Sequence, residues 1–392
     1  MKVTGYRSVT TEHDWGRLTG DANGVMSGPR TEVHVLILET DAGIDGVGVG
    51  PHGDIDRVFD AVEGQDPRGV SVLYDRMLAR AFKTGHAGAT FGAIGAIDTA
   101  LWDLKAKAAG EPLWRTLGAL DRFVPGYASG LDIALDDEGL ARLYEEFADR
   151  GFSAGKLKGG RSLGDDLRRL KIMRGALARN SANPALMLDA NESWNRSQAV
   201  RYLTALEREV DLTWIEEPVR RWDAAGLASV RRGIRAAVAT GENLTGLEQY
   251  RPLLDADAVD IVQVGNVWGI THFLRVATLA HGHDLPVSPV AYNTNPIAHA
   301  AAAVPNLLTF EVQDLGFPVG LDVDQEFDDG GIVLGDRPGI GIIVDESLLS
   351  SDSAQAVPPA TGPHIRPERA ALRLVAEPDV IDDPTVPLRP VS

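Results

Sequence analysis

The sequence predicts an α/β protein whose larger part is a parallel (β/α) barrel, on the strength of two observations. From about Val124, short apolar runs recur at intervals of 22 to 31 residues, and they end near Tyr127, Lys158, Asp189, Glu216, Gly241, Gln263, Ser288 and Glu311. Amphipathic stretches with helical spacing lie between these runs, over residues 137–150, 162–179, 197–207, 223–235, 247–254, 270–281 and 296–303. Eight strands that alternate with helices are typical of a (β/α) barrel.

The first 122 residues mix strand and helix signals. Residues 31–40 alternate between polar and apolar types and then run apolar before an Asp41-Ala-Gly turn, which predicts a β-hairpin. Residues 91–109 carry apolar side chains at helical spacing and are followed by Gly110 and Pro112, which predicts a helix. Two Gly-rich polar loops, 18–30 and 83–90, precede these elements, and loops of this kind are surface lids or plain connectors.

The C-terminal part has a different character. After Glu311 a segment rich in Gly and Pro leads to a short apolar run that ends at Asp345. Residues 351–392 contain eight prolines, many alanines and acidic residues, and one short helix-like piece over 368–376. Such a composition predicts a tail or arm that has no core of its own and is held by something else, such as a neighbouring subunit.

Composition limits the classes of function. A net charge of −18 opposes binding to nucleic acid or to an anionic membrane surface, since both require clustered Lys and Arg. The sequence has no cysteine, which excludes disulfides, zinc–thiolate sites and thiol nucleophiles. No apolar run approaches the roughly 18 residues of a membrane span, and the N-terminus lacks the apolar stretch of a signal peptide. We therefore expect a cytoplasmic protein.

Three consecutive predicted strands each end in an acid: Asp189, Glu216 and Glu242. In a barrel, the ends of neighbouring strands lie roughly 5 Å apart, on the face where functional residues gather. Three carboxylates that close together must bind a cation or take up protons, and hard oxygen ligands suit Mg²⁺. The alternative is that each acid caps the helix that follows it. Three acids in succession favour the metal site.

Lys156 and Lys158 stand two positions apart at the end of the second predicted strand, so both side chains point to the barrel interior. A buried Lys beside another cation has a lowered pKa, and its neutral amine acts as a base. Solvated surface lysines are the alternative, which the apparently buried strand disfavours. A Lys base beside a metal fits removal of an α-proton, because negative charge then builds on the substrate carboxylate as an enediolate. Glu311, if protonated, would share a hydrogen bond with that carboxylate.

These motifs resemble the enolase superfamily and, within it, the mandelate racemase / muconate lactonizing enzyme group, over about residues 1–348. The motifs that carry the resemblance are 96–105, 110–118, Lys156-Leu-Lys158, Asp189-Ala-Asn191, Trp214-Ile-Glu216-Glu217-Pro218 and Gly241-Glu242-Asn243. The resemblance implies a modified TIM-type barrel over 123–330, an α+β capping domain over 1–122 whose loops 18–30 and 83–90 form a lid, and a return to the cap over 331–350. Residues 351–392 remain the Pro-rich tail or arm.

The resemblance also implies the ligands and the assembly. One Mg²⁺ per chain is expected on Asp189, Glu216 and Glu242, with Mn²⁺ as an alternative. Lys158 is expected as the base, and Lys156 and Glu311 as contacts of the substrate carboxylate. The partner is then a small carboxylate molecule, with no nucleic acid and no membrane. Relatives in this group also predict a homo-oligomer, either a dimer or an octamer.

Two positions depart from the group's pattern. Racemase-like members end the sixth strand in Asp and the seventh in His, and muconate-cycloisomerase-like members have a second Lys on the sixth strand. Aligned on Trp268-Gly269, this sequence holds Gln263 and Val290 at those positions, and neither side chain titrates. A racemase needs an acid on the face opposite the base, so a two-base reaction is disfavoured.

The sequence therefore favours a one-base elimination. We expect Lys158 to remove the α-proton of an acid sugar, which then loses water to give a 2-keto-3-deoxy acid; the polar lid loops favour a polar substrate. A racemase, epimerase or cycloisomerase with a displaced acid is an alternative, as is a non-catalytic relative. The candidate substrate contacts are Asn191, Gln263, Tyr292 and His86. The candidate donors of a proton to the leaving hydroxyl are Lys158 itself, Tyr292, His86 and His13.

Overall fold

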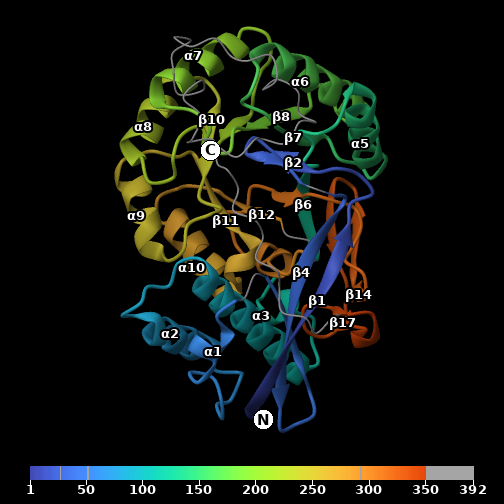
Figure 1. The fold of residues 1–392 in the computed structure, drawn as a ribbon, viewed down its shortest axis with the longest axis vertical. Helices are drawn as coiled ribbons and strands as arrows, with labels where there is room; N and C mark the ends of the chain where they lie inside the picture. Colours follow the sequence, from blue (N-terminus) through green and yellow to red (C-terminus); the bar gives the residue numbers. More distant parts are fainter. Residues whose placement is uncertain (27, 51–52, 292–293, 350–392) are drawn as a thin grey trace.

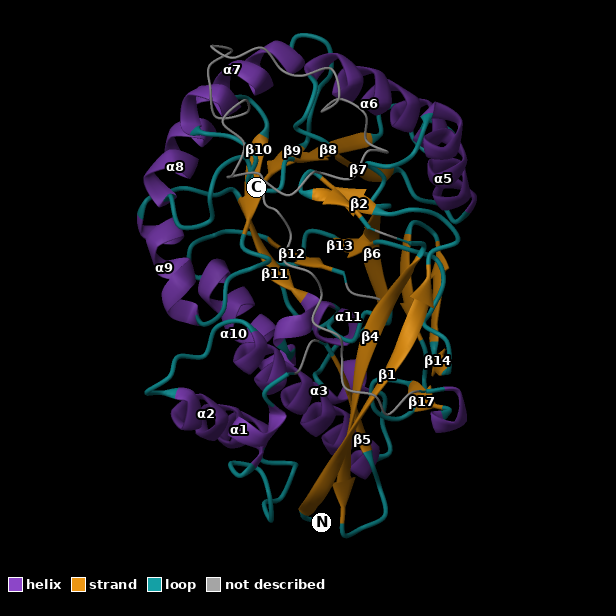
Figure 2. Cartoon of the chain, in the orientation of Figure 1, coloured by secondary structure: helices purple, strands orange, loops and turns teal. Residues whose placement is uncertain are grey.

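The computed structural model describes residues 1–26, 28–50, 53–291 and 294–349, so the predicted tail over 351–392 lies outside the described residues. An N-terminal cap of strands and helices lies against a larger, barrel-like α/β domain (Figures 1 and 2). This arrangement confirms the predicted fold class. Among the described residues, no helix combines the length and the apolar character that crossing a bilayer would require.

The barrel strands coincide with the apolar runs of the sequence. In chain order they are β6 (Phe123–Ala128), β7 (Ala154–Lys158), β8 (Ala185–Asp189), β9 (Trp214–Glu216), β10 (Ala237–Thr240), β11 (Ile261–Gly265), β12 (Val287–Val290) and β13 (Phe310–Val312). Each strand from β6 to β11 pairs in parallel with the next strand in the sequence, and β13 pairs with β6. In the described part of the chain, no ladder joins β12 to β13. Val287 instead bonds to the backbone of Asn306 and Leu308, just before β13.

Helices cover the outside of these strands (Figure 2). They are α5 (Asp137–Asp149), α6 (Leu163–Leu177), α7 (Arg196–Leu206), α8 (Ala224–Gly233), α9 (Leu247–Asp255), α10 (Ile270–His281) and α11 (Ala298–Ala301), with the 3-10 turn η1 (Asn266–Trp268) before α10. Four of them begin where a polar side chain accepts a hydrogen bond from a backbone N–H of the first turn: Asp136, Ser162, Asn195 and Asp223. These caps fix where the βα loops before α5, α6, α7 and α8 end.

An apolar layer fills the barrel interior below the strand ends. Its buried members come from five strands: Tyr127, Met187, Trp214, Ala239 and Ile261. Because side chains alternate along a strand, the next inward positions toward the carboxyl ends carry the polar residues of the predicted site. The site therefore has an apolar floor.

The cap is built from an antiparallel sheet and a long helix. Its elements are β1 (Val3–Asp14), β4 (Arg30–Thr40), β5 (Gly46–Val49), α1 (Ile55–Phe59), α2 (Val70–Ala81), α3 (Ala89–Ala109) and α4 (Leu113–Thr116). The predicted hairpin is β4 with β5, and β1 pairs with the other edge of β4. The predicted helix is α3, which ends at Gly110 in the left-handed conformation (φ 69°). Gly48 lets β5 approach α3 closely, because a Cβ there would lie 2.0 Å from the carbonyl oxygen of Ala96.

One buried carboxylate joins the cap to the barrel domain. Asp98, on α3, accepts hydrogen bonds from the backbone N–H of Thr271 (2.7 Å) and from its Oγ1 (2.6 Å). Thr271 lies in the first turn of α10, whose own N-cap residue, Gly269, has no side chain to cap it. Asp98 therefore caps α10 from another helix. Burial raises the pKa of Asp98 to about 7, although the hydrogen bonds from Thr271 act in the opposite direction.

The chain then returns to the cap through short antiparallel strands. They are β14 (Leu321–Val323), β15 (Gln325–Asp328), β16 (Gly331–Leu334) and β17 (Ile342–Val344), followed by the 3-10 turn η2 (Glu346–Leu348). β16 pairs with β6 and with β15, and β14 pairs with β17. These antiparallel strands begin at Leu321, before the predicted start of the return at residue 331.

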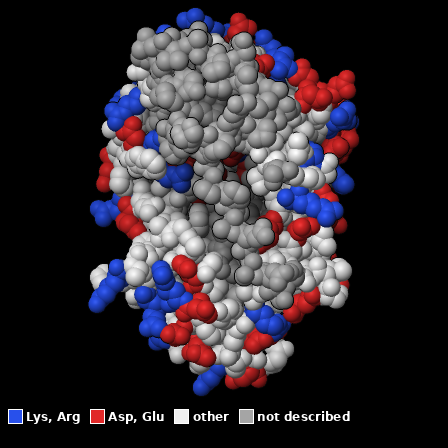
Figure 3. All heavy atoms as spheres, in the orientation of Figure 1, with Lys and Arg blue, Asp and Glu red and all other residues white. Residues whose placement is uncertain are grey.

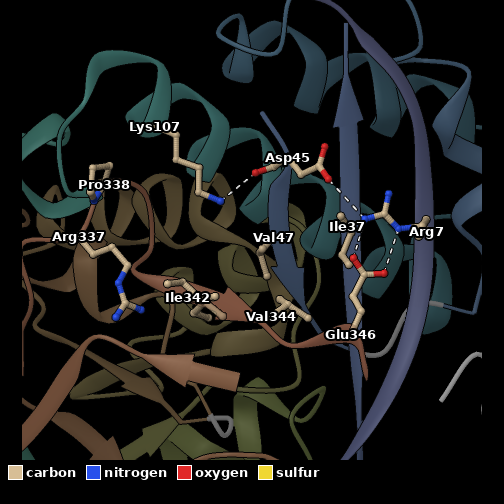
Figure 4. Close-up of a pocket in the computed structure, with 11 residues that line it drawn as sticks. Arg7, Ile37, Asp45, Val47, Lys107, Arg337, Pro338, Ile342, Val344 and Glu346 are labelled. Carbon is tan, nitrogen blue, oxygen red and sulfur yellow. Dashed lines mark hydrogen bonds and ion pairs between the residues drawn. The ribbon is translucent and has the colours of Figure 1, made fainter. Parts of the chain in front are cut away.

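A surface pocket of about 410 Å³ lies where the return meets the cap (Figure 4). Apolar side chains form part of its lining: Ile37, Val47, Ile342 and Val344. Arg7 reaches Glu346 (2.8 Å) and Asp45 (3.4 Å), and Lys107 donates to the carbonyl oxygen of Asp45 (2.8 Å). The ion pair between Arg7 and Glu346 therefore joins the cap to the end of the return. Elsewhere on the face drawn in Figure 3, acidic and basic side chains are intermingled.

Candidate active site

The acids predicted at strand ends lie together at the mouth of the barrel. Asp189 ends β8 and Glu216 ends β9, and the two are register partners in the parallel ladder. Glu242 follows β10, the next strand. Asp189 and Glu216 are fully buried. The structure therefore brings the three predicted metal ligands to adjacent strand ends.

The two lysines of β7 point into the same space. The Nζ of Lys158 lies 2.5 Å from Oδ2 of Asp189. The Nζ of Lys156 lies 2.5 Å from Oε1 of Glu216 and 2.8 Å from Oε1 of Glu311, the acid on β13. Both lysines are buried, so these ion pairs form away from bulk water. The alternative of solvated surface lysines is wrong.

The pKa expected for these lysines is also wrong. Burial alone would lower the pKa of Lys158, but the attraction of Asp189 outweighs it, and the pKa is raised. The pKa of Lys156 is likewise raised, because Glu216 and Glu311 outweigh its burial. A neighbouring cation lowers the pKa of a lysine, but around Lys156 and Lys158 the carboxylates outnumber the cations.

The acids respond to the same crowding in different ways. Burial raises the pKa of Glu216 to about 8, with repulsion from Asp189 and Glu242 added to it, in spite of the contact with Lys156. Burial also raises the pKa of Glu242. Asp189 has a lowered pKa, because Lys158 and Lys156 together outweigh its burial. Lys156 and Lys158 lower the pKa of Glu311 in the same way. The cluster holds more acids than lysines, which favours either a proton or a cation among the acids.

The donor chemistry of this cluster fits a hard divalent cation. Asp189, Glu216 and Glu242 offer carboxylate oxygens, and two lysines do not balance these acids together with Glu311. Within the described part of the chain, no three acids are already gathered as a formed metal centre. Asp189, Glu216 and Glu242 are the residues that would hold such a cation.

Neighbouring amides and rings hold these ligands in place. Asn191, at φ 43°, donates its backbone N–H to Oδ1 of Asp189 (2.8 Å) and its side-chain amide to Oδ2 (3.2 Å). The side chain of Asn243 donates to Glu242 (2.9 Å), and the indole of Trp268 donates to the Glu242 carbonyl oxygen (2.5 Å). Tyr127 lies 3.3 Å from Nζ of Lys156. The supporting roles of Asn243, Trp268 and Tyr127 were not predicted from the sequence.

The wall across the barrel from the lysines carries neutral groups. Gln263, on β11, donates its amide to Oε2 of Glu216 (2.6 Å). Ser288, on β12, is the register partner of Gln263, and Val290 is the register partner of Gly265. β11 is four strands from β7 in the ring of eight, so this wall faces Lys158. Gln263 and Val290, the two positions that depart from the family pattern, therefore supply no titratable group on this wall.

The predicted lid loop over residues 18–30 lies on the mouth of the barrel (Figure 1). It contains a small hairpin, β2 (Gly20–Asp21) with β3 (Gly24–Val25). Gly20 donates to the carbonyl oxygen of Leu131 (2.8 Å), after β6. Arg161, after β7, donates to the carbonyl oxygens of Asp21 (3.3 Å) and Ala22 (3.4 Å). Ala22 in turn donates its backbone N–H to Oδ1 of Asn191 (3.3 Å).

One predicted substrate contact, His86, and one candidate proton donor, His13, lie away from the carboxylates of the site. The structure places His86 against Glu248 of α9 (2.6 Å) and against the ring of Phe91, at the edge of the barrel rather than among the carboxylates. His13 lies on β1 with its Nε2 2.7 Å from Asp314, in the loop after β13. Tyr292 lies outside the described residues.

Two family models match the chain. Residues 24–118 match the N-terminal domain of the mandelate racemase / muconate lactonizing enzyme family, and residues 139–348 match the enolase C-terminal domain-like model. A 3,6-anhydro-alpha-L-galactonate cycloisomerase of Streptomyces coelicolor is 33% identical over 289 residues, covering 73% of this chain and 79% of that protein. An L-talarate/galactarate dehydratase of Salmonella typhimurium is 32% identical over 339 residues, covering 81% and 82%.

Among solved structures, a racemase from Streptomyces coelicolor with bound magnesium superposes with a TM-score of 0.79 and 30% identity, covering 88% of this chain and 98% of that one. The three similar proteins are thus described as a cycloisomerase, a dehydratase and a racemase. They share a fold but differ in reaction. The choice among these reactions depends on the residues of the site itself.

Proposed function

Because the chain belongs to the mandelate racemase / muconate lactonizing enzyme family of the enolase superfamily, we propose that it is a magnesium-dependent lyase that dehydrates an acid sugar to a 2-keto-3-deoxy acid. The observation that carries this proposal is the asymmetry of the barrel wall. Lys158 faces the site from β7, whereas Gln263 and Val290 occupy the positions opposite it on β11 and β12. Proton transfer on one face, followed by loss of a substituent, needs a single base.

The acids at the strand ends would hold the cation. Bound by Asp189, Glu216 and Glu242, one Mg²⁺ per chain, or Mn²⁺ in its place, would supply positive charge beside the substrate carboxylate, where negative charge grows as the α-proton leaves. Gln263 keeps Glu216 oriented through its amide, and Asn191 does the same for Asp189. These contacts lower the cost of bringing the ligands into place.

The lysines and Glu311 would act on the substrate. Lys156 would contact the carboxylate through its ammonium group, and Glu311, already 2.8 Å from Lys156, would stand on the same side. A cation held by Asp189 would weaken the ion pair that raises the pKa of Lys158. The neutral Nζ of Lys158 would then take the proton from C2, and the electron pair of that bond would pass into the carboxylate as an enediolate. The C3–O bond then breaks, and the ammonium of Lys158 returns its proton to the leaving hydroxyl. Water and an enol result, and the enol becomes the 2-keto acid.

The substrate class is supported by the relatives and by the lid. The Salmonella relative is named for talarate and galactarate, which are acid sugars, and the Streptomyces relative for an anhydro sugar acid. The hairpin β2–β3 places Asp21 close enough to Lys158 and Asp189 for their charges to affect its pKa. A polar residue facing the site from above suits a molecule that carries several hydroxyl groups.

The test is a screen of mono- and diacid sugars for 2-keto acid formation, with Mg²⁺ and in a metal-free control. We expect at least one acid sugar to be dehydrated only with the cation present. Lys158→Ala should abolish turnover, whereas Lys171→Ala, which removes an exposed lysine from α6, should leave it intact. If turnover is unchanged in Lys158→Ala, Lys158 is not the base. If the protein is inactive on every acid sugar, it fits a non-catalytic relative.

A cycloisomerase or racemase is the second candidate, because one relative is a cycloisomerase and one structural neighbour a racemase. Incubation with substrate in D₂O separates these reactions. A dehydratase gives a product that has lost water. Exchange at C2 with inversion, or ring opening or closure without loss of water, would assign the chain to the second group.

A further inference from the structure

Among the three proposed cation ligands, Glu242 is the one that the barrel strands position least. Asp189 and Glu216 are the last residues of β8 and β9, and they are register partners in the parallel ladder. Each of these two acids is also held by an ion pair with a lysine of β7. The ladders of β10 end at Thr240, two residues before Glu242. The position of Glu242 therefore depends on contacts outside the ladders.

Trp268, the last residue of η1, supplies such a contact. Its indole N–H donates to the carbonyl oxygen of Glu242 over 2.5 Å. The two groups meet in a confined space, because a Cβ at Gly265, which ends β11, would lie 2.5 Å from that oxygen and 2.7 Å from the indole nitrogen. The carbonyl carbon and the side chain of Glu242 share one Cα, so this hydrogen bond also restrains where the carboxylate lies.

The cap helix α3 holds Trp268 in turn, since α3 lies against η1 and α10. The contacts come from Phe91, Gly95 and Asp98, whose spacing puts them on one face of the helix. The buried ring of Phe91 packs edge-on against the indole, with ring centroids 5.8 Å apart and an angle of 61° between the planes. A Cβ at Gly95 would lie 2.8 Å from the carbonyl carbon of Trp268, so the two backbones are in direct contact. Asp98 caps α10 immediately after η1.

We propose that the cap positions Glu242 through Trp268, so that the contact between α3 and η1 sets the affinity of the site for Mg²⁺. Phe91 orients the indole, and the indole orients the main chain of Glu242. Trp268 is then a positioning residue for the cation site, and the inference rests on the proposed function for the identity of that cation. Mg²⁺ requires nearly ideal octahedral geometry, whereas Ca²⁺ accepts flexible coordination. A displaced Glu242 should therefore weaken the binding of Mg²⁺ more than that of Ca²⁺.

Calorimetric titration of the full-length protein with Mg²⁺ and with Ca²⁺, without substrate, tests the link between Trp268 and Glu242. Trp268→Phe keeps an aromatic ring and removes the N–H. We expect its Mg²⁺ affinity to fall about tenfold, as on loss of other groups that support a metal ligand, and its Ca²⁺ affinity to fall about threefold or less. Gly265→Ala, whose methyl group would clash with both the indole and the carbonyl, should have the same effect.

Phe91→Leu tests the link between the cap and Trp268. It should lower the Mg²⁺ affinity about threefold or more in the wild-type background, because an edge-on ring pair contributes a factor of roughly two to ten. In the Trp268→Phe background it should lower the affinity by less than about 1.5-fold, since the ring there has no N–H to orient. The matched control is Phe147→Leu, which removes a buried edge-on pair with Phe152 before the start of β7. This control should lose stability but keep its Mg²⁺ affinity.

The proposal is overturned if Trp268→Phe, shown to be folded by circular dichroism, binds Mg²⁺ as tightly as the wild-type protein. It is also overturned if the two cations lose affinity equally, because the whole site would then be loosened, or if Phe91→Leu has the same effect in both backgrounds. A wild-type protein that binds no Mg²⁺ contradicts the proposed function as well as this inference. Mg²⁺-dependent dehydration with an affinity that is insensitive to Trp268 contradicts the inference alone.

Discussion

Replacing Asp98 by Asn is expected to change how the stability of the protein depends on pH. Asp98 is fully buried, and its carboxyl group has a pKa of about 7, compared with 3.8 for the ordinary side chain. The folded state therefore holds a proton here that the unfolded state releases between pH 3.8 and 7. Stability is highest below this range and is lost as the pH rises through it.

The size of the effect follows from the width of that range. Each pH unit is worth about 1.4 kcal/mol, so a rise from about pH 5 to pH 7 should cost the wild-type protein roughly 3 kcal/mol, with little further change to about pH 8.5. The amide introduced by Asp98→Asn would resemble the protonated acid, since its oxygen can accept from the N–H of Thr271 and its NH₂ can donate to Oγ1. The variant should therefore escape this loss.

Chemical denaturation at about pH 5 and about pH 8.5 measures the difference. We expect the stability advantage of Asp98→Asn over the wild-type protein to be larger at the higher pH than at the lower one, by roughly 3 kcal/mol. Asp98→Ala, which strands both donors of Thr271, should be less stable than Asp98→Asn throughout. Asp75→Asn is the control, because Asp75 forms an exposed ion pair with Arg275 of α10; its effect should be below about 1 kcal/mol. If the wild-type protein and Asp98→Asn differ in stability by the same amount at both pH values, the pKa of Asp98 is not raised in the folded protein.

Further predictions concern other buried groups. His299, held between the N–H of Trp114 and the carbonyl oxygen of Ile340, has its pKa lowered by burial to about 4. Its contribution to stability is complete above pH 6.5 and should fall by roughly 3 kcal/mol as the pH drops to 4. Acid denaturation of His299→Gln should not show this loss. Gly48→Ala should lower the free energy of unfolding by about 2 kcal/mol or more through its clash with α3, whereas Gly164→Ala, with open space on α6, should raise it by about 0.5–1 kcal/mol; thermal melting with both variants tests this. Lys158→Met should reduce kcat at least about a thousandfold yet still bind Mg²⁺ in calorimetry, and loss of Mg²⁺ binding would show that Lys158 mainly holds the site together.

The barrel could be predicted because its signals are local and repeated. Each strand is a short apolar run, and each acid at a strand end, such as Asp189, follows directly in the sequence. The parallel order of a barrel then places consecutive strand ends side by side without further information. The cap was harder to predict from the sequence, because β1 is largely polar and is recognised mainly by its pairing with β4.

Features that depend on distant partners could not be predicted. The raised pKa of Lys158 was not predicted, because the ion pair with Asp189 that outweighs its burial forms only in the folded barrel. His86 was assigned to the substrate from its place in a polar loop, but its partner Glu248 lies 162 residues away. The pairing of Gln263 with Ser288 depends on a strand register that the sequence does not reveal.

The hairpin β2–β3 is attached to the barrel largely by its main chain. The backbone of Gly20, Asp21 and Ala22 makes the contacts with Leu131, Arg161 and Asn191. Substitutions among the lid's own side chains therefore leave these attachments in place. A loop attached in this way separates the groups that anchor it from the side chains that it presents to the site. Such separation of anchoring from selection is a physical basis for the evolvability of a family whose members carry out several reactions on one scaffold.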